Sequence, residues 1–577
     1  MSAIVGIDLG TTNSLVAHMT PEGPKVISNA LGEVLTPSVV GLHDDGSLLV
    51  GRTAKELQVL QPDRCASLFK RLMGTSEKLD LRGRSYSPEE LSSLVLRALK
   101  EDAEAYLGRR VDRAVITVPA YFNDQQRKAT IAAGRLAGFR VDRIINEPTA
   151  AAMAYGFHES KLESLLMIFD LGGGTFDVSL VELFDGVLEV RASSGESLLG
   201  GEDFTRTLAS RVLDSHGYSF EKTELDHPRL VSRMFQQCEQ AKIRLSSQES
   251  TVVRIPNLDG EFDAVRRETT VQRADFQGWT NSILARIEAP VRRVLNDAKV
   301  NKTDIVEVIL VGGATRMPAL IERVTALFDK TPQSRIDPDQ VVAMGAAVQA
   351  ALISRDAAVD DLVVTDVAPF TLGIETSKRI GLDRRAGFFT PIIHRNTTIP
   401  TSRVQRVETI EPNQTKVIVK IYQGESRRTE NNLYLGEFEV RGVPRGPAGQ
   451  PVEIRFTYDL NGVLEVEAVV VATGKSFSHV VARYASGMSP AQIEAAVKEL
   501  QKLKLHPRDE AQNQFVIRRA ERMLAELPFD VRAVVEQVLD GFEEALELRD
   551  NQAVERFRTT LHEYFARFDD GSVPDGD

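Results

Sequence analysis

The amino-acid sequence predicts a multidomain protein with an α/β region, an antiparallel β-sandwich and a small helical bundle. The chain has 577 residues, and single hydrophobic cores stop growing at roughly 250–300 residues, so we expect several domains. Strand-length apolar runs alternate with helical patterns up to about residue 355, and short strands with period-2 alternation follow from about 367. Helical periodicity then dominates from about 489. Each change of pattern predicts a change of architecture.

The α/β prediction rests on buried strands that alternate with helices. Apolar runs at residues 115–118, 165–169 and 308–311 have the length and composition of buried strands. Residues 87–106 are predicted to form a helix, because Ser87 is a suitable N-cap and proline follows at the first helical position. This alternation is typical of α/β domains.

The next region predicts a sandwich of short antiparallel strands. Apolar and polar residues alternate over 417–421, 452–456 and 464–468. The Asn-Gly pair at 461–462 lies between two such runs and favours a hairpin turn. We therefore expect an antiparallel β-sandwich over residues 367–487.

The last region predicts a helical bundle. The string SPAQ at residues 489–492 fits a capping box with proline at the first helical position. Helical periodicity continues to about residue 568, and the polar residues 569–577 are expected to be disordered.

Composition and charge exclude several classes of function. The net charge of −12 argues against nucleic acid as the main partner, because phosphate contacts need a basic face. The sequence contains no stretch of 18 apolar residues, so we expect no membrane span. An apolar strand pattern follows Met1 directly, and we see no signal peptide there. We therefore expect a cytoplasmic protein. Cys65 and Cys238 lack metal-ligand spacing and are expected to be buried apolar thiols, with a redox or disulfide role as the alternative.

Two segments of the α/β region resemble each other. Residues 7–15 and 169–177 both read as a strand, Asp-Leu-Gly, a tight turn and a second strand. An internal duplication that places two hairpins face to face across a cleft would explain this pattern. The alternative for either segment alone is an ordinary glycine turn.

These hairpins carry the groups that a bound phosphate and its metal ion need. Glycines let the backbone approach closely, so that turn N–H groups can point at phosphate oxygens. Threonine hydroxyls add further donors. Asp8 and Asp170 stand at strand ends and would hold Mg²⁺ through water, since that ion dehydrates reluctantly.

Three strings resemble signatures of the 70-kDa heat-shock (DnaK-type) molecular chaperone family. They are GIDLGTTNS at residues 6–14, NEPTAAA at 146–152 and DLGGGTFD at 170–177. The resemblance runs from residue 3 to about 485. It implies an actin-like ATPase domain with duplicated lobes over 1–357, a linker over 358–366, a β-sandwich substrate-binding domain over 367–487 and a short α-helical lid over 488–568. The chain is most similar to HscC-like bacterial members, because the lid is short and the segment between Gly74 and Ser87 is shorter than usual.

The resemblance also implies ATP/ADP and Mg²⁺ as cofactors, with K⁺ as a further candidate ion, and assigns residues to them. Lys70 corresponds to the lysine that reaches the γ-phosphate, and Glu147 and Asp177 to carboxylates that arrange the metal-bound and attacking waters. The implied catalytic residues are Lys70, Glu147, Asp170, Thr175 and Asp177. The implied nucleotide-binding residues are Asp8, Gly10, Thr11, Thr12, Asn13, Gly172, Gly173, Gly174, Glu239, Lys242, Ser246, Gly312, Gly313 and Arg316. Ile243 stands where some members place an arginine over the adenine, so aliphatic packing is expected there.

The implied function is that of an ATP-dependent chaperone, which binds extended hydrophobic segments of unfolded or client polypeptides and cycles them by ATP hydrolysis with a J-domain co-chaperone. Whether a nucleotide-exchange factor docks stays open, because the outer part of the ATPase lobe is shortened. A holdase that barely hydrolyses ATP, and an actin-like filament or small-molecule kinase, are the alternatives.

The resemblance assigns coupling and peptide contacts as well. The apolar linker is expected to dock on the ATPase domain, with Pro119 and Arg127 as the relay that senses ATP. The implied coupling residues are Pro119, Arg127, Leu362, Val363, Val364 and Asp366. A pocket for one apolar client side chain is expected from Ile374, Val407 and Val417, and an arch over the peptide from Ile410; the alternative for each is the sandwich core. The first groove loop, 377–387, is longer and more basic than is usual.

Overall fold

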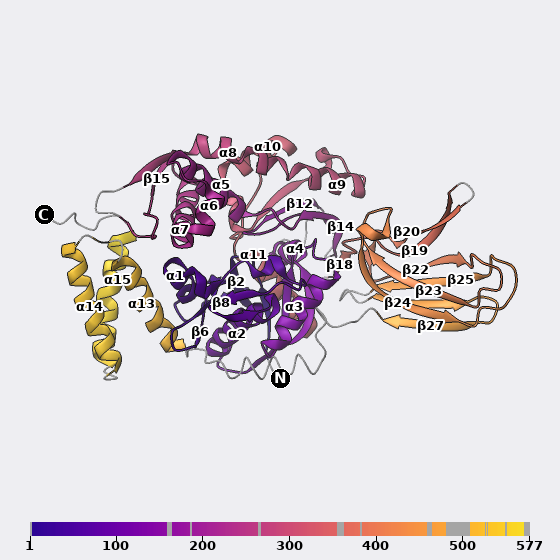
Figure 1. The fold of residues 1–577 in the computed structure, drawn as a ribbon, viewed down its shortest axis with the longest axis horizontal. Helices are drawn as coiled ribbons and strands as arrows, with labels where there is room; N and C mark the ends of the chain where they lie inside the picture. Colours follow the sequence, from indigo (N-terminus) through magenta and orange to yellow (C-terminus); the bar gives the residue numbers. More distant parts are fainter. Residues whose placement is uncertain are drawn as a thin grey trace.

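The computed structural model describes residues 3–158, 164–184, 187–262, 267–354, 363–380, 383–458, 464–480, 508–524, 527, 529–547 and 551–569. Figure 1 shows an elongated molecule with a β-sandwich at one end, a helical bundle at the other and an α/β part between them. The predicted hairpin turn at 461–462, the predicted cap at 489–492 and Leu362 lie outside the described residues.

The first half of the α/β part is built on a six-stranded sheet with the order β11-β10-β1-β2-β3, and β4 pairs with β2. Its central strand β1 pairs parallel with β10 and antiparallel with β2. The strands are β1 (Ala3–Asp8), β2 (Asn13–Thr20), β3 (Gly23–Ile27), β4 (Thr36–Pro37), β10 (Val111–Val118) and β11 (Arg140–Asn146). Two small sheets lie outside it, formed by β5 (Val40–Leu42), β6 (Leu48–Val50) and β7 (Cys65–Ala66), and by β8 (Leu79–Leu81) and β9 (Arg84–Tyr86).

The second half repeats this pairing. Its six-stranded sheet has the order β17-β12-β13-β14-β18-β21, in which β12 pairs parallel with β17 and antiparallel with β13. The strands are β12 (Ser164–Leu171), β13 (Phe176–Phe184), β14 (Val187–Glu196), β17 (Glu307–Val311), β18 (Val363–Val367) and β21 (Thr398–Ile399). A two-stranded sheet of β15 (Ser250–Arg254) and β16 (Glu268–Gln272) lies apart from it. The shared pattern of one parallel and one antiparallel neighbour supports an internal duplication.

Helices cover both sheets. Two of them, α4 and α11, pack against each other where the two halves meet. A Cβ added to Gly345 would lie 1.6 Å from the Ala150 carbonyl oxygen, so α4 and α11 approach at van der Waals distance. The helices of this part are α1 (Arg52–Leu60), α2 (Pro88–Leu107), α3 (Asp124–Leu136), α4 (Glu147–His158), α5 (Gly201–Ser215), α6 (Phe220–Asp226), α7 (Pro228–Leu245), α8 (Arg273–Ala285), α9 (Glu288–Ala298), α10 (Pro318–Phe328) and α11 (Val341–Ser354).

The helix predicted over residues 87–106 is confirmed as α2. The Ser87 hydroxyl accepts a hydrogen bond from the Glu90 amide at 3.2 Å, and the Glu90 carboxylate accepts one from the Ser87 amide at 2.8 Å. Gly108 ends the helix in the left-handed region. The predicted strands at 115–118, 165–169 and 308–311 are confirmed within β10, β12 and β17.

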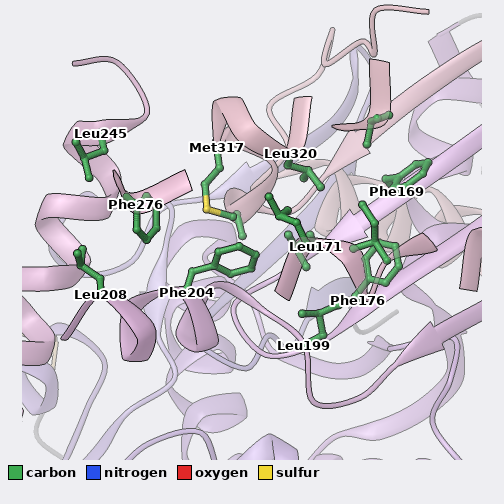
Figure 2. Packing of buried hydrophobic residues seen from close by; sticks show 14 of the residues in the cluster. Phe169, Leu171, Phe176, Leu199, Phe204, Leu208, Leu245, Phe276, Met317 and Leu320 are labelled. Atoms are coloured by element: carbon green, nitrogen blue, oxygen red, sulfur yellow. The ribbon is translucent and has the colours of Figure 1, made fainter. Parts of the chain in front are cut away.

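The larger apolar core fills the space between the second sheet and its helices. Figure 2 shows Phe169, Leu171 and Phe176 from the sheet packing toward Phe204 and Leu320 from the helices. All five side chains are buried. This packing fixes the ends of β12 and β13, from which the second Asp-Leu-Gly hairpin projects.

The sandwich consists of two four-stranded antiparallel sheets, with the orders β20-β19-β23-β24 and β22-β25-β26-β27. Its strands are β19 (Leu372–Ile380), β20 (Asp383–Ile393), β22 (Thr401–Glu408), β23 (Lys416–Gln423), β24 (Leu433–Arg441), β25 (Pro451–Tyr458), β26 (Leu464–Val470) and β27 (Lys475–Val480). The strands predicted at 417–421, 452–456 and 464–468 are confirmed. The basic segment 377–387 was expected as a loop, but its described residues extend β19 and β20 as a hairpin.

The helical bundle comprises α13 (Arg508–Leu524), α14 (Phe529–Glu547) and α15 (Asn551–Asp569), packed around Val516, Val535 and Phe542. We expected it beside the sandwich, as a lid over the peptide groove. In the structure it lies at the other end of the molecule, with α13 against α1 (Figure 1). Among the described residues, no helix is long and apolar enough to span a membrane.

Candidate functional site

The two Asp-Leu-Gly hairpins face each other and touch at their tips. A Cβ added to Gly173 would lie 2.3 Å from the Thr12 methyl group, and one added to Gly174 would lie 2.4 Å from the Thr11 methyl group. Only glycine allows this approach, because a side chain at either position would collide with the opposite hairpin. The structure thus brings the two predicted hairpins together across one cleft.

Behind the tips, four acidic side chains surround one lysine. Lys70, in a short 3-10 turn, donates to the Glu147 carboxylate at 2.7 Å, and both side chains are buried. Asp8, at the end of β1, accepts from the Thr117 hydroxyl at 3.1 Å. Asp177, in β13, accepts from the Tyr121 amide at 3.1 Å through Oδ1, while its buried Oδ2 has no hydrogen-bond partner among the described residues.

Burial gives these carboxyl groups unusual proton affinities. It raises the pKa of Asp8 to about 7 and that of Asp177 to about 8, and in both cases repulsion from Glu147 adds to the shift. The pKa of Asp170 is raised well above its ordinary value for the same two reasons. Lys70 opposes all three shifts. A further cation would let these groups ionise together.

The residues present therefore fit a divalent cation. Asp8 and Asp170 both line a cavity of about 70 Å³ between the hairpins, together with Lys70 and Glu147. Among the described residues, no three His, Cys, Asp or Glu side chains form a group that would hold a metal ion. An ion held by Asp8 and Asp170 would thus take water as its other ligands, as Mg²⁺ often does. The predicted residues that line this cavity are Asp8, Gly10, Thr11, Thr12, Asn13, Lys70, Glu147, Asp170, Gly172, Gly173, Thr175, Gly312 and Gly313.

Of the other predicted nucleotide-binding residues, Glu239 and Lys242 lie on α7 and Ser246 directly follows that helix. Lys242 donates to the Glu239 carboxylate at 2.6 Å and to the Gly201 carbonyl at 3.0 Å. Burial alone would raise the pKa of Glu239, but Lys242 and the Thr205 hydroxyl together lower it below its ordinary value. Ser246 bonds back to the Lys242 carbonyl at 3.4 Å. The side chain of Ile243 is exposed, so its aliphatic surface is free to pack on a flat ring.

The third predicted glycine segment lies against the second hairpin. Gly312 has φ of 83°, and a Cβ there would lie 2.4 Å from the Leu171 carbonyl oxygen. Arg316, four residues later, pairs with Asp337 at 2.8 Å and Asp339 at 3.0 Å. These acidic partners hold the guanidinium at the edge of the cleft.

A comparison with known protein families shows to which family the chain belongs. A model of the Hsp70 family, described as Hsp70 protein, matches residues 4–81 and 75–570, which is nearly the whole chain. The chain belongs to the Hsp70 family. Hsp70 proteins are chaperones and ATPases that generally bind ATP or ADP with Mg²⁺, client polypeptides and co-chaperones. The two matched segments meet at residues 75–81, within the stretch that we expected to be shortened.

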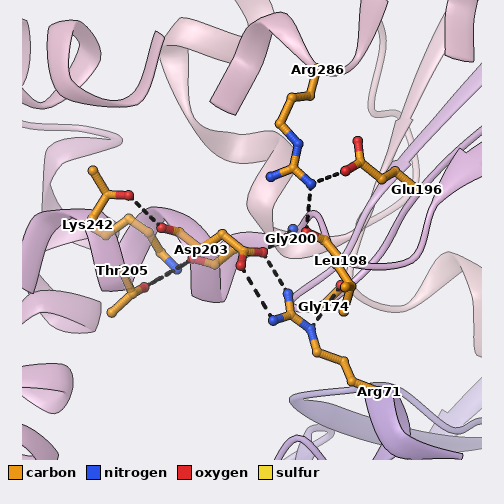
Figure 3. Close-up of polar contacts among 11 residues, drawn as sticks. Arg71, Gly174, Glu196, Leu198, Gly200, Asp203, Thr205, Lys242 and Arg286 are labelled. Atoms are coloured by element: carbon orange, nitrogen blue, oxygen red, sulfur yellow. Dashed lines mark hydrogen bonds and ion pairs between the residues drawn. The ribbon is translucent and has the colours of Figure 1, made fainter. Parts of the chain in front are cut away.

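Sequence analysis missed one residue that joins the two lobes of this Hsp70 site. Arg71 donates to the Gly174 carbonyl at 3.1 Å and to the Asp203 carboxylate at 2.6 Å (Figure 3). Asp203 in turn accepts from the Gly200 amide at 2.8 Å. Arg71 therefore ties the turn that carries Lys70 to the tip of the second hairpin. Its partner lies 132 positions away, so no local pattern indicates the contact.

The described part of the segment predicted as the linker, residues 363–366, lies in strand β18 of the second sheet. Val363 and Val364 pair in parallel with Val187 and Leu188 of β14. Asp366 is buried and accepts from the Asn146 side-chain amide at 2.9 and 3.0 Å, and from Thr149 at 3.2 Å. Asn146 immediately precedes Glu147, and its side-chain oxygen accepts from Arg127 at 2.6 Å. Burial raises the pKa of Asp366.

The predicted relay lies in the same region. Pro119 follows β10 and its carbonyl accepts from the Phe122 amide at 3.1 Å. Arg127 donates to the carbonyl groups of Ala120 and Phe122 at 3.1 and 2.9 Å. The turn at 119–122, which supplies the amide bound to Asp177, is thereby connected to the linker through Arg127 and Asn146.

The sandwich contacts the α/β part of the molecule directly. Arg395 pairs with Asp297 at 2.8 Å, and Asn396 accepts from the Ser193 amide at 3.0 Å. The Tyr121 and Phe370 rings also pack, with their centroids 4.5 Å apart. Tyr121 belongs to the same turn as Phe122, so one turn contacts both Asp177 and the sandwich.

The four predicted groove residues differ in their burial. Ile374 is 2% exposed and belongs to the sandwich core. Val407 and Val417 are half-buried against that core, and Ile410 is exposed. The structure thus brings Val407, Val417 and Ile374 to one apolar cluster and leaves Ile410 at its rim.

Proposed function

We propose that this protein is an ATP-dependent chaperone that binds extended hydrophobic segments of client polypeptides and releases them in a cycle of ATP hydrolysis with a J-domain co-chaperone. The observation that carries the proposal is the buried Lys70–Glu147 pair between two facing hairpins, connected through Asn146 to a docked linker strand. A phosphate site and a mobile interdomain connection are both needed for such a cycle.

In the proposed reaction, water attacks the γ-phosphorus of ATP while its bond to the ADP oxygen breaks, which gives ADP and phosphate, and a bound Mg²⁺ would neutralise phosphate charge. Asp8 and Asp170 would hold the metal through water. The hairpin amides bind phosphate oxygens, and the Lys70 ammonium stabilises the charge that develops on the transferred group. The unpartnered Asp177 Oδ2 accepts a hydrogen bond from the attacking water and orients it. Glu147 keeps Lys70 in position and is the second carboxylate available to that water.

The proposed coupling runs from Glu147 to the linker. Any change of position of Glu147 on ATP binding or hydrolysis moves its neighbour Asn146, which holds Asp366 with two hydrogen bonds. Loss of those bonds would release β18 from β14 and, with it, the sandwich. The domain division, the HscC-like subtype and the groove formed by Ile374, Val407, Val417 and Ile410 are part of the same proposal.

A steady-state ATPase assay with a panel of J-domain proteins tests this function. We expect a slow basal rate that one J-domain protein accelerates, and faster release of a labelled apolar peptide when ATP is added. ATP binding without turnover under every condition would instead favour a holdase. ATP-dependent sedimentation with no peptide binding would favour an actin-like filament.

The basic hairpin of the sandwich predicts a preference among client peptides. Lys378 lies opposite Arg385, and Arg379 lies opposite Arg384. Like charges in facing positions destabilise a hairpin, so an acidic ligand would relieve this repulsion. Arg384 also donates to the Ile410 carbonyl at 3.4 Å, which places this charge at the proposed arch.

Peptides that share one apolar centre and carry Lys, Ser or Asp flanks would measure this preference. We expect the Asp-flanked peptide to bind tightest at low salt and to lose its advantage at high salt, because screening acts over about 8 Å at physiological ionic strength. Tightest binding of the Lys-flanked peptide, or a ranking that ignores salt, would show that the hairpin does not select charge.

A further inference from the structure

The C-terminal bundle is anchored to the ATPase half by an ion pair that is almost completely buried. Arg522 of α13 lies 2.9 Å from the Glu56 carboxylate of α1, and the two side chains are only 10% and 6% exposed. Leu31 of the ATPase half packs against the apolar core of the bundle. Burial of both charges at one contact defines a specific docking position for α13.

The Arg522–Glu56 pair itself is held by charge and not by a hydrogen bond. Arg522 Nε and Glu56 Oε2 are close but not aligned as donor and acceptor, and neither atom has a hydrogen-bond partner among the described residues. Reversal of either charge would therefore leave two like charges buried against each other, with no second contact at these atoms to hold the position.

The same helix also lines the cavity that leads to the nucleotide site. A cavity of about 870 Å³ begins at Thr11 and Thr12 of the first hairpin and passes Glu239 of α7. Its outer lining includes Arg519 and Arg522 of α13. Residues of α1 and α7 also line it, so α13 adds a wall to a cavity that belongs otherwise to the ATPase half.

The two walls of the cavity that α1 and α7 form are joined to each other by a hydrogen bond. Ser232 of α7 donates to the Gln58 carbonyl of α1 at 2.9 Å. Separation of α1 from α7 would break this hydrogen bond and widen the path of a molecule that leaves the hairpins along this cavity. Because α13 is attached to α1 through Glu56, its docking restrains that movement.

We propose that the C-terminal bundle is an intramolecular gate on nucleotide release. While α13 is docked on α1, it closes the outer end of the nucleotide cavity, and ADP or ATP leaves when α13 separates from α1. The two arginines also place positive charge beside the exit of a phosphate ligand, and Arg519 is held there by stacking on Phe565 at 4.9 Å. This inference rests on the proposed nucleotide binding. It adds that the chain's own C-terminal bundle controls the rate of nucleotide exchange.

The test compares nucleotide dissociation rates in the full chain. The variants are Arg522→Glu, Glu56→Arg and the double variant that exchanges the two charges. Release of a fluorescent ADP is followed in stopped flow after an excess of unlabelled ADP is added. We expect each single variant to release ADP about tenfold faster, and the double variant to return to within about twofold of the original rate, because opposite charges meet again.

Two further variants separate gating from loss of structure. Arg532→Glu reverses an exposed charge on α14 of the same bundle and should leave the release rate unchanged. Arg522→Gln removes the charge without reversing it and should give an intermediate rate. Thermal unfolding of every variant establishes whether the fold is kept.

The outcomes distinguish this inference from the proposed function. If the original protein binds neither ADP nor ATP, the proposed function fails. If nucleotide binds but both single variants release it at the original rate, or if the double variant stays fast, the gate is overturned. Release of a bound peptide in the presence of ADP should be the same in Arg522→Glu and in the original protein. Equal acceleration of peptide and nucleotide release would show that the bundle is instead a lid on the groove.

Discussion

The Lys70→Ala variant is expected to hydrolyse ATP at least about 100-fold more slowly than the original protein, while it still binds ATP. An ammonium fixed beside the transferred phosphoryl group stabilises charge that develops mainly in the transition state, so its loss lowers turnover more than affinity. Lys70 is suited to this role because it is buried and held at 2.7 Å by Glu147. Single-turnover hydrolysis and a separate nucleotide titration measure the two effects.

This variant also leaves Glu147 buried without its cationic partner. Removal of one member of a buried pair costs about 3–5 kcal/mol, so the melting temperature is expected to fall as well. The double variant Lys70→Ala with Glu147→Gln removes the unpaired charge and should recover stability without recovering turnover. Lys78→Ala, at an exposed position in the following segment, is the matched control. Near-normal turnover in Lys70→Ala would exclude Lys70 from the reaction.

The Asp366→Asn variant is expected to lose most of the acceleration of peptide release by ATP. Both carboxylate oxygens of Asp366 accept from the Asn146 amide, and an asparagine would place its own NH₂ group against one of these donors. A buried hydrogen bond to a charged group contributes about 1.5–3 kcal/mol, so loss of one such bond shifts the docking equilibrium by about 10- to 100-fold. The readout is the ratio of peptide release rates with ATP and with ADP.

Peptide affinity in the presence of ADP should be unchanged in Asp366→Asn, because the proposed groove residues do not contact this side chain. Asp112→Asn, which alters a carboxylate in a surface ion pair with Arg110, is the matched control. If ATP accelerates release equally in Asp366→Asn and in the original protein, the linker strand does not carry the signal. Leu362 and Val363, which the sequence assigned to the same coupling, would then need to be tested separately.

Much of the α/β part could be predicted because its signals are local. A serine three residues before a glutamate determines where α2 begins, and the bonds that form there join only Ser87 and Glu90. The Asp-Leu-Gly hairpins are equally local, since strand, turn and strand are consecutive in the chain. The contact between the two hairpins could be inferred from the sequence only because two copies of the pattern occur.

The sequence pattern gave less information about the sandwich. Alternation at 417–421 identifies a strand, but it does not separate residues that line a groove from those that fill the core. Ile374 shows the difficulty, because its 2% exposure makes it part of the core while Val407 and Val417 are only half-buried. The segment 377–387 was expected as a loop because its basic residues suit solvent, yet β19 and β20 continue into it as paired strands.

By itself, the sequence determined the succession of α/β, sandwich and helical regions and the residue types of the proposed phosphate site, because these depend on neighbours within a few positions. Only the tertiary structure decided that Arg71 joins the two lobes, that Asp366 meets Asn146 across 220 positions, and that the bundle docks on α1. Such contacts depend on where the folded chain brings distant segments together. An arginine on an amphipathic helix has the same local pattern whether it faces solvent or, like Arg522, a buried carboxylate on another domain.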